Sequence, residues 1–147
     1  MTIVNLSGSD LILLLVSLAA AYFFALPLGW ARRPHADPVI GLRVFPLVSV
    51  SSCAYLFLGQ RLFAGAASNE QSDVLQGLMT GIGFVGAGAI VKEGGRARGV
   101  AMAAAVWTTG AIGACVAYGY FAMAAVVSLM SLIIFRVGRR TTTASHA

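Results

Sequence analysis

The sequence has little charge, and acidic residues are especially scarce. Only 10% of its 147 residues are charged, with five Asp or Glu against ten Lys or Arg, whereas soluble domains carry about 25%. The chain is 59% hydrophobic, with a mean hydropathy of +0.86. These values argue against a water-soluble enzyme, a nucleic-acid-binding module and a disordered tail, and they indicate an integral membrane protein.

Side chains that carry catalysis or bind metals are also scarce. Cys53 and Cys115 lie inside apolar runs, and the two histidines, His35 and His146, form no ligand cluster. No nucleophile is accompanied by a base and an orienting acid. We therefore expect no enzyme activity, no cofactor, no metal site, no disulfide framework and no nucleic-acid partner.

Five apolar segments can be drawn that approach or exceed the length needed to cross a hydrocarbon core of about 30 Å. They are Leu11–Trp30, Val44–Leu62, Val74–Val91, Val100–Ala117 and Tyr120–Val137. The tight corner Tyr118-Gly119-Tyr120 divides the last two, since one continuous helix would far exceed a bilayer. The sequence predicts an all-α bundle of about five transmembrane helices over residues 11–137, with residues 1–10 as an extracytoplasmic N-terminus and residues 138–147 as a cytoplasmic tail.

Basic residues are distributed unevenly between the two ends of this bundle. Nine of the ten lie after the first and third segments or at the C-terminal end of the fifth and beyond it: Arg32, Arg33, Arg43, Lys92, Arg96, Arg98, Arg136, Arg139 and Arg140. The other end holds Arg61, with Asp10 and the outer-lip acids Glu70 and Asp73. Because short loops rich in Lys and Arg stay in the cytoplasm, we expect the N-terminus outside and the C-terminus inside.

The third segment is rich in glycine. At about 100° per residue, Gly77, Gly81 and Gly88 share one face, and Gly83 and Gly86 lie roughly opposite. Glycines let transmembrane helices approach closely, so we expect this helix at the centre of the bundle and Gly81→Leu to destabilise it. A narrow pore is the alternative. The G-x-G-x-x-G pattern lacks the strand and the acid of a dinucleotide site.

The fourth segment presents small residues together with Trp107 and Thr108. We expect the Thr108 hydroxyl to bond a carbonyl one turn back or a neighbouring helix. Trp107 lies well inside its segment, where it either plugs a cavity beside the glycine helix or fills volume.

The loop from Lys92 to Gly99 has two interpretations. With three cations and one anion, it is either a topogenic loop held to anionic lipid or a site where Arg98 grips a buried carbonyl, a phosphate or a partner. We expect Arg98 to donate hydrogen bonds to carbonyls at the end of the third segment, so that Arg98→Lys is damaging. Gly41-Leu42-Arg43 forms a similar entrance to the second segment.

The residues Gly81–Gly99, followed by Ala103–Trp107, resemble the core signature of the MgtC/SapB membrane proteins, and Gly41-Leu42-Arg43 resembles their second signature. The resemblance covers roughly residues 11–137. It implies a multi-pass protein of the bacterial inner membrane, linked to growth in low magnesium and, in pathogens, to survival inside host cells. It favours regulation of other membrane machinery, such as an F-type ATP synthase or a cation transporter, and it implies no catalytic site.

The chain departs from the family pattern at several polar positions. Apolar residues or glycine stand where the family often has an acid, a glutamine, a threonine or another polar group, at Ala31, Val44, Gly77 and Met102. Many members also continue into a soluble cytoplasmic domain, whereas we expect the transmembrane domain alone here. Activities that depend on those groups or on that domain are in doubt.

Two functional hypotheses follow. In the first, the protein is a non-enzymatic regulator that contacts a larger membrane complex through its helices, since none of the five segments contains Asp or Glu and ion-coupled transport usually needs such residues. In the second, it is a small ion transporter or channel formed by a homodimer around the glycine-rich third segment.

The orientation gives the first testable prediction. A cysteine placed at residue 70 should react with a membrane-impermeant maleimide on intact cells, and one at residue 96 only after permeabilisation, because the basic end faces the cytoplasm. Labelling in the reverse pattern would overturn the topology.

Overall fold

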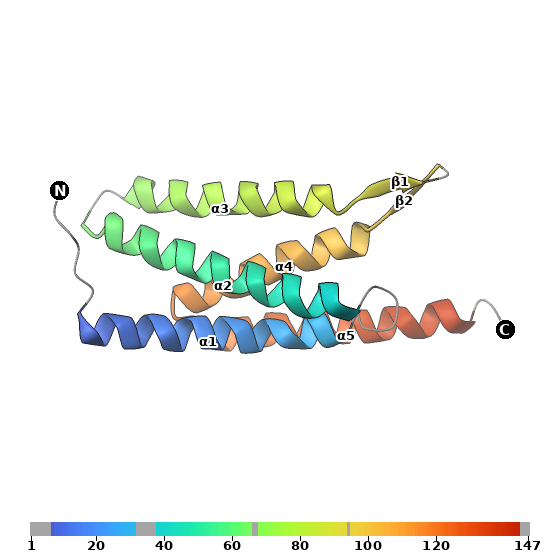
Figure 1. Cartoon of the computed structure of the whole chain (residues 1–147), viewed down its shortest axis with the longest axis horizontal. Coiled ribbons are helices and arrows are strands. Elements are labelled where there is room, and N and C mark those ends of the chain that lie inside the picture. Colours follow the sequence, from blue (N-terminus) through green and yellow to red (C-terminus); the bar gives the residue numbers. More distant parts are fainter. Residues whose placement is uncertain (1–6, 32–37, 66–67, 94, 145–147) are drawn as a thin grey trace.

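The computed structural model describes residues 7–31, 38–65, 68–93 and 95–144. Arg32, Arg33, His35 and His146 lie outside these residues, as do the side chains of Arg139 and Arg140. The described chain forms five helices and one hairpin: α1 (Gly8–Ala31), α2 (Pro38–Leu62), α3 (Ser68–Gly88), β1 (Val91–Glu93), β2 (Arg96–Arg98), α4 (Val100–Ala117) and α5 (Phe121–Ala144) (Figure 1). The predicted all-α bundle of five helices is confirmed.

Three of the helices, α1, α2 and α4, are long and apolar enough to cross a membrane. The bounds of α4 are those predicted, whereas α1, α2 and α5 each run beyond their apolar segments. The apolar part of α5, Phe121–Val137, falls short of a full span, and α3 opens with the polar residues Ser68–Asp73. Hydropathy therefore locates all five helices but marks only three as spans.

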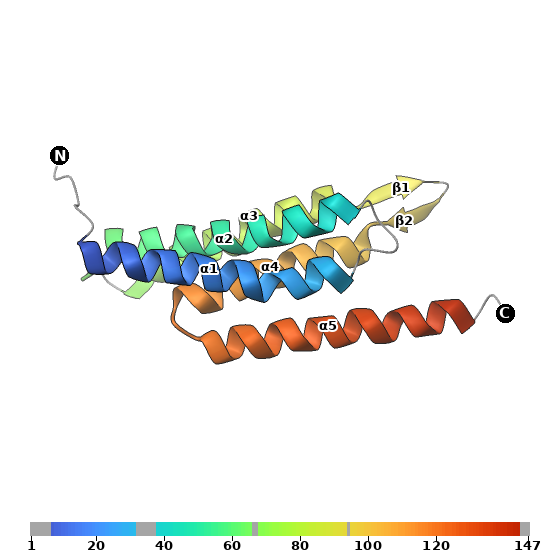
Figure 2. The same ribbon diagram turned by 60° about the horizontal axis from the view of Figure 1, so that its bottom comes forward.

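The fourth helix, not the third, is the centre of the bundle. α4 packs against each of the other four helices, whereas α3 packs mainly against α4 and more loosely against α2 (Figures 1 and 2). Among the described residues of α3, only Ile82 and Gly86 are buried. The expectation of a central third helix is wrong, because the closest backbone crossing uses Gly113 of α4, whereas only Gly86 of the α3 glycines contacts a helix closely.

The tightest of these crossings joins α4 to α2. A Cβ atom at Gly113 would collide with the carbonyl oxygen of Ser49 and lie 2.9 Å from Cβ of Ser52. On another face of α4, Gly110 receives the side chain of Ile82 from α3. Small residues at such points let helix backbones approach closely and gain dispersion contacts. α4 is thereby packed closely on two sides.

The corner between α4 and α5 is a glycine-terminated helix end. Gly119 has φ of 78°, and its N–H donates to the carbonyl of Val116 at 3.0 Å. The N–H of Tyr120 donates to the carbonyl of Cys115 at 2.8 Å. This pair of bonds defines a Schellman motif, which ends α4 and turns the chain back, as the sequence predicts.

Two side chains bond across helices far apart in sequence. Nε2 of Gln60 on α2 donates to the carbonyl of Ala117 at 3.0 Å, at the last turn of α4. Oγ of Ser128 on α5 donates to the carbonyl of Phe24 on α1 at 2.6 Å. Each bond satisfies polar groups inside an apolar bundle, where unpaired ones are costly.

The α2–α4 crossing gives the second prediction. Gly113→Ala should lower the free energy of unfolding by about 1–3 kcal/mol, because the new methyl group forces two backbones apart. The matched control is Gly83→Ala, where a Cβ meets no atom within 4 Å. Since alanine favours a helix over glycine, the control should be neutral or stabilising. Equal thermal midpoints for the two variants in detergent would contradict this packing.

Candidate functional site

An open groove of about 530 Å³ lies between α2 and α3, with α4 at its base. Its lining comes from α2 (Leu47, Val48, Ser51, Ser52 and Tyr55), from α3 (Gly77, Leu78, Gly81, Ile82 and Val85) and from Val106 of α4. It exists because α3 contacts α2 only loosely. The groove thus opens on the side of the bundle where helix packing is least complete.

The groove is mostly apolar but contains hydroxyl groups. Ser51 and Tyr55 are exposed, and their hydroxyls form no hydrogen bond within the described residues. The Ser52 hydroxyl instead donates to the carbonyl of Val48 at 2.7 Å. Two hydroxyls of α2 therefore remain available to a molecule that enters the groove.

The glycines of α3 face the groove or open space. A Cβ at Gly81, Gly83 or Gly88 would meet no atom within 4 Å, and one at Gly77 would lie 3.9 Å from the Tyr55 hydroxyl. Only Gly86 makes a close helix contact, 3.3 Å from the carbonyl oxygen of Ala103. The prediction that Gly81 packs against a neighbouring helix is wrong, because α3 turns that face away from α4.

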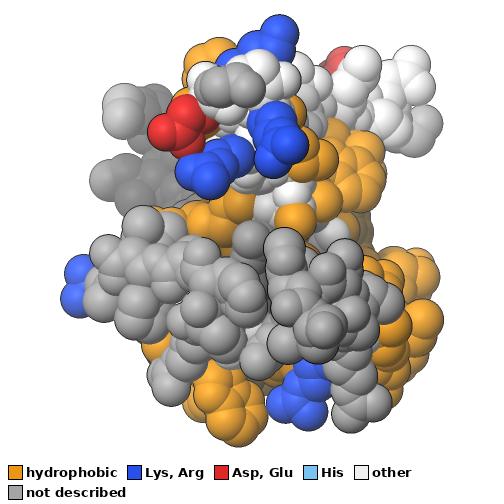
Figure 3. All heavy atoms as spheres, turned by 90° about the vertical axis from the view of Figure 1, so that its right-hand side faces the viewer, with side chains coloured by type: hydrophobic (Ala, Val, Ile, Leu, Met, Phe, Trp, Pro, Cys, Tyr) orange, Lys and Arg blue, Asp and Glu red, His pale blue; other side chains and the backbone are white. Residues whose placement is uncertain are grey.

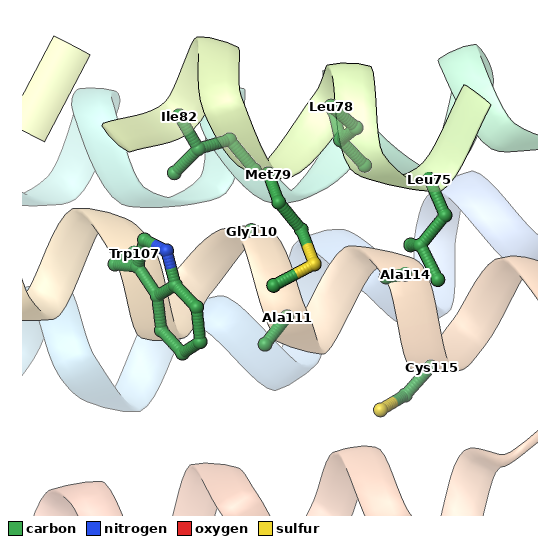
Figure 4. A pocket seen from close by; sticks show the side chains of 9 residues that line it. All are labelled: Leu75, Leu78, Met79, Ile82, Trp107, Gly110, Ala111, Ala114 and Cys115. Carbon is green, nitrogen blue, oxygen red and sulfur yellow. The ribbon is translucent and has the colours of Figure 1, made fainter. Parts of the chain in front are cut away.

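A smaller cavity of about 190 Å³ lies on the other side of α3, against α4. Figure 4 shows Met79 reaching from α3 towards Ala111, with Trp107 beside it. The Trp107 side chain lines this cavity and remains half exposed. The Thr108 hydroxyl donates to the carbonyl of Ala104 at 2.9 Å, one turn back, as predicted. These residues line or border the α3–α4 seam, and the cavity between them is lined mostly by apolar side chains.

The Gly41-Leu42-Arg43 segment marks a close crossing of α1 and α2. A Cβ at Gly41 would lie 3.3 Å from the carbonyl oxygen of Gly29, and one at Gly29 would lie 2.7 Å from that of Gly41. Arg43 is exposed on the same helix. Gly41 could be selected from the sequence but Gly29 could not, because its contact with Gly41 joins two different helices.

The loop between α3 and α4 is a β-hairpin in which Arg98 is exposed. Nη1 of Arg98 donates to Oε2 of Glu93 at 2.8 Å, so the expected bonds to α3 carbonyls are replaced by a surface ion pair. Gly99 caps the N-terminus of α4 with φ of 86°, and a Cβ there would collide with the carbonyl oxygen of Ala89. In this signature the glycine is structural, and Arg96 and Arg98 face solvent.

The outer-lip acids Glu70 and Asp73 are exposed in the first turns of α3. Neither forms an ion pair among the described residues. At the same end Arg61 of α2 pairs with Asp10 of α1. The described residues contain no cluster of three His, Cys, Asp or Glu side chains that could hold a metal ion.

The positions that depart from the family pattern lie in packed surroundings or in the groove. Ala31 is buried, and Val44 and Met102 are half-buried against the hydrophobic core. Gly77 lines the groove. Apolar residues therefore suit the first three sites, and the missing side chain at Gly77 widens the groove.

Comparison with known proteins identifies a family. A sequence model of the MgtC family matches residues 18–144. Protein SrpB of Synechococcus elongatus is 30% identical over 146 residues, which cover 90% of this chain and 79% of that protein. Protein MgtC of Brucella abortus is 31% identical over 119 residues, covering 80% of this chain and 48% of that protein.

A further relative is named putative magnesium transporter YhiD, from Escherichia coli K12. It is 29% identical over 107 residues, covering 69% of this chain and 50% of that protein. The chain thus spans about half the length of these MgtC and YhiD relatives. No solved structure matches it.

The hairpin signature gives the third prediction. Arg98→Lys should change the free energy of unfolding by less than about 1 kcal/mol, because an exposed ion pair contributes little. Gly99→Val should cost about 1–3 kcal/mol from the backbone conformation alone, and more from the collision with Ala89. Thermal denaturation in detergent compares the two, and a Lys variant as unstable as the Val variant would refute this assignment.

Proposed function

The chain belongs to the MgtC family, and on that premise we propose that it is a non-enzymatic regulator of other machinery in the bacterial inner membrane, active under magnesium limitation or stress. The observation that supports this proposal is the open groove beside α3. The occupant that we propose is a transmembrane helix of a larger complex, such as an ATP synthase or a cation transporter.

The chemistry of the groove suits a helix. Gly77 and Gly81 leave room for a partner backbone to approach, which is how small residues promote helix association in membranes. The hydroxyls of Ser51 and Tyr55 can bond polar groups of that partner, because they have no partner among the described residues. No charged side chain lines the groove, so a partner helix would not need to bury a charge against it.

The alternative is a small ion transporter or channel built by a homodimer. It draws support from the name of the Escherichia coli relative, a putative magnesium transporter, and from the unpacked glycine faces of α3. Against it stands the absence of Asp and Glu from the predicted membrane segments, because Mg²⁺ sites usually include carboxylates. The regulatory hypothesis needs no such site.

Two leucine variants of α3 test the proposed docking groove. Gly81 lines the groove and Gly83 does not, yet neither glycine packs against the described chain. Gly81→Leu should therefore abolish recovery of the ATP synthase or cation transporter in affinity capture from mild detergent, with an unchanged thermal midpoint. Gly83→Leu should retain that partner.

The same variants distinguish the two hypotheses in liposomes. A regulator should carry no Mg²⁺ or monovalent-ion flux when reconstituted alone. A flux that Gly83→Leu blocks would establish the transporter instead. Equal capture of the complex by wild type and both variants would show that the groove is not the docking site.

A further inference from the structure

The β1–β2 hairpin projects beyond the start of α4, away from the helix bundle (Figure 1). Its strands pair antiparallel, with Val91 opposite Arg98, Lys92 opposite Ala97 and Glu93 opposite Arg96. Every residue of both strands is exposed. The hairpin is thus available to contact whatever surrounds this end of the molecule.

The hairpin carries cations that the protein does not neutralise. Arg98 pairs with Glu93, whereas the side chains of Lys92 and Arg96 form no ion pair or hydrogen bond within the described part of the chain. In an antiparallel ladder, opposed residues share a face and successive residues alternate. Lys92 therefore lies on one face of the hairpin and Arg96 on the other.

Because both faces of the hairpin carry cations, binding to a medium that surrounds the hairpin is favoured over binding to a single flat partner. A layer of phospholipid headgroups is such a medium, because its phosphates can approach from every side. A rigid acidic surface or one bound anion would meet only one of the two faces.

The base of the hairpin is apolar. Ile90, Val91 and Val100 are 42%, 60% and 54% exposed. Ile90 and Val91 lie between α3 and Lys92 along the chain, and Val100 is the first residue of α4, two residues after Arg98. Interfacial elements place apolar side chains at the acyl boundary and cations among the headgroups. The order of residues along the hairpin, from apolar side chains at its base to cations further out, matches this arrangement.

The surrounding end of the molecule is also basic. In addition to the cations of the hairpin, Arg43 and Arg136 are exposed. Figure 3 shows Lys and Arg side chains gathered over the projecting hairpin. At the opposite end, Arg61 is neutralised by Asp10. Charge complementarity therefore selects acidic rather than zwitterionic lipid.

We propose that the hairpin binds anionic phospholipid, with Lys92 and Arg96 contacting headgroup phosphates while Ile90, Val91 and Val100 rest at the acyl boundary. The exposed ion pair with Glu93 limits the contribution of Arg98. This lipid site is separate from the α2–α3 groove and does not depend on how that groove is used.

The test titrates the full chain in detergent with phosphatidylglycerol or phosphatidylcholine and counts bound lipid by native mass spectrometry. A basic residue at an anionic surface contributes about 5-fold in affinity, so Lys92→Gln with Arg96→Gln should weaken phosphatidylglycerol binding by about 25-fold. Binding of phosphatidylcholine should not change. Glu93→Gln should strengthen phosphatidylglycerol binding, because it releases Arg98.

Arg61→Gln is the control, since it removes one cation from the opposite end and should leave the affinity for phosphatidylglycerol unchanged. The proposal is overturned if the double variant binds both lipids as wild type does, or if it loses both lipids equally. It is also overturned if inorganic phosphate displaces phosphatidylglycerol at equal concentration, because the site would then recognise a free anion. A thermal midpoint measured without added lipid verifies that each variant is folded.

Discussion

The backbone contact between α2 and α4 is the constraint on which the rest of the bundle depends. Gly113 brings α4 against the carbonyl oxygen of Ser49, and no larger residue fits at this distance. With α2 on one side, the other faces of α4 receive α1, α3 and α5. The side chains of Phe45, Val106 and Ile112 are fully or nearly fully buried around this axis. Inside a bilayer the hydrophobic effect does not drive helices together, because lipid tails are as apolar as the side chains. Close packing between the helices therefore supplies the stability.

The closest backbone crossings join α2 to α4 and α1 to α2, so most glycines of α3 make no close helix contact. Only Gly86 contacts α4 closely, and Gly81 faces the groove beside α2. Among the described residues, α3 packs mainly against α4 and α2, and most of its glycines make no close contact with either helix. A peripheral helix of this kind can accept a foreign helix without disturbing the core, which is the physical basis of the proposed regulatory role.

Much of the fold could be predicted from the sequence, because membrane crossing imposes length and apolarity on the helices that span, and α1, α2 and α4 meet both conditions. The bounds of α4 and the Gly119 corner follow from local pattern alone. The position of α3 does not, since a helical wheel shows which glycines share a face but not which face has a neighbour. The strands around Gly95 were also missed, because this charged segment carries no β pattern.

The candidate site was only partly accessible to sequence reasoning. Gly77 and Gly81 could be selected as small residues on one face, but Ser51 and Tyr55 join them only through the angle between α2 and α3. The sequence predicts that Arg98 donates hydrogen bonds to buried carbonyls, whereas the register of the hairpin brings it near Glu93, with which it forms an ion pair. In each case the missing information was a contact between segments, which spacing within one segment does not contain.

Disulfide mapping in native membranes tests the central position of α4 most directly. In a background with Cys53 and Cys115 changed to alanine, cysteines at residues 86 and 103 should form an intramolecular disulfide, because Gly86 of α3 lies against Ala103 of α4. A cysteine at residue 86 should form none with one at Ala25, which is buried on α1. Efficient 86–25 crosslinking without 86–103 crosslinking would place α3 at the centre and contradict this account.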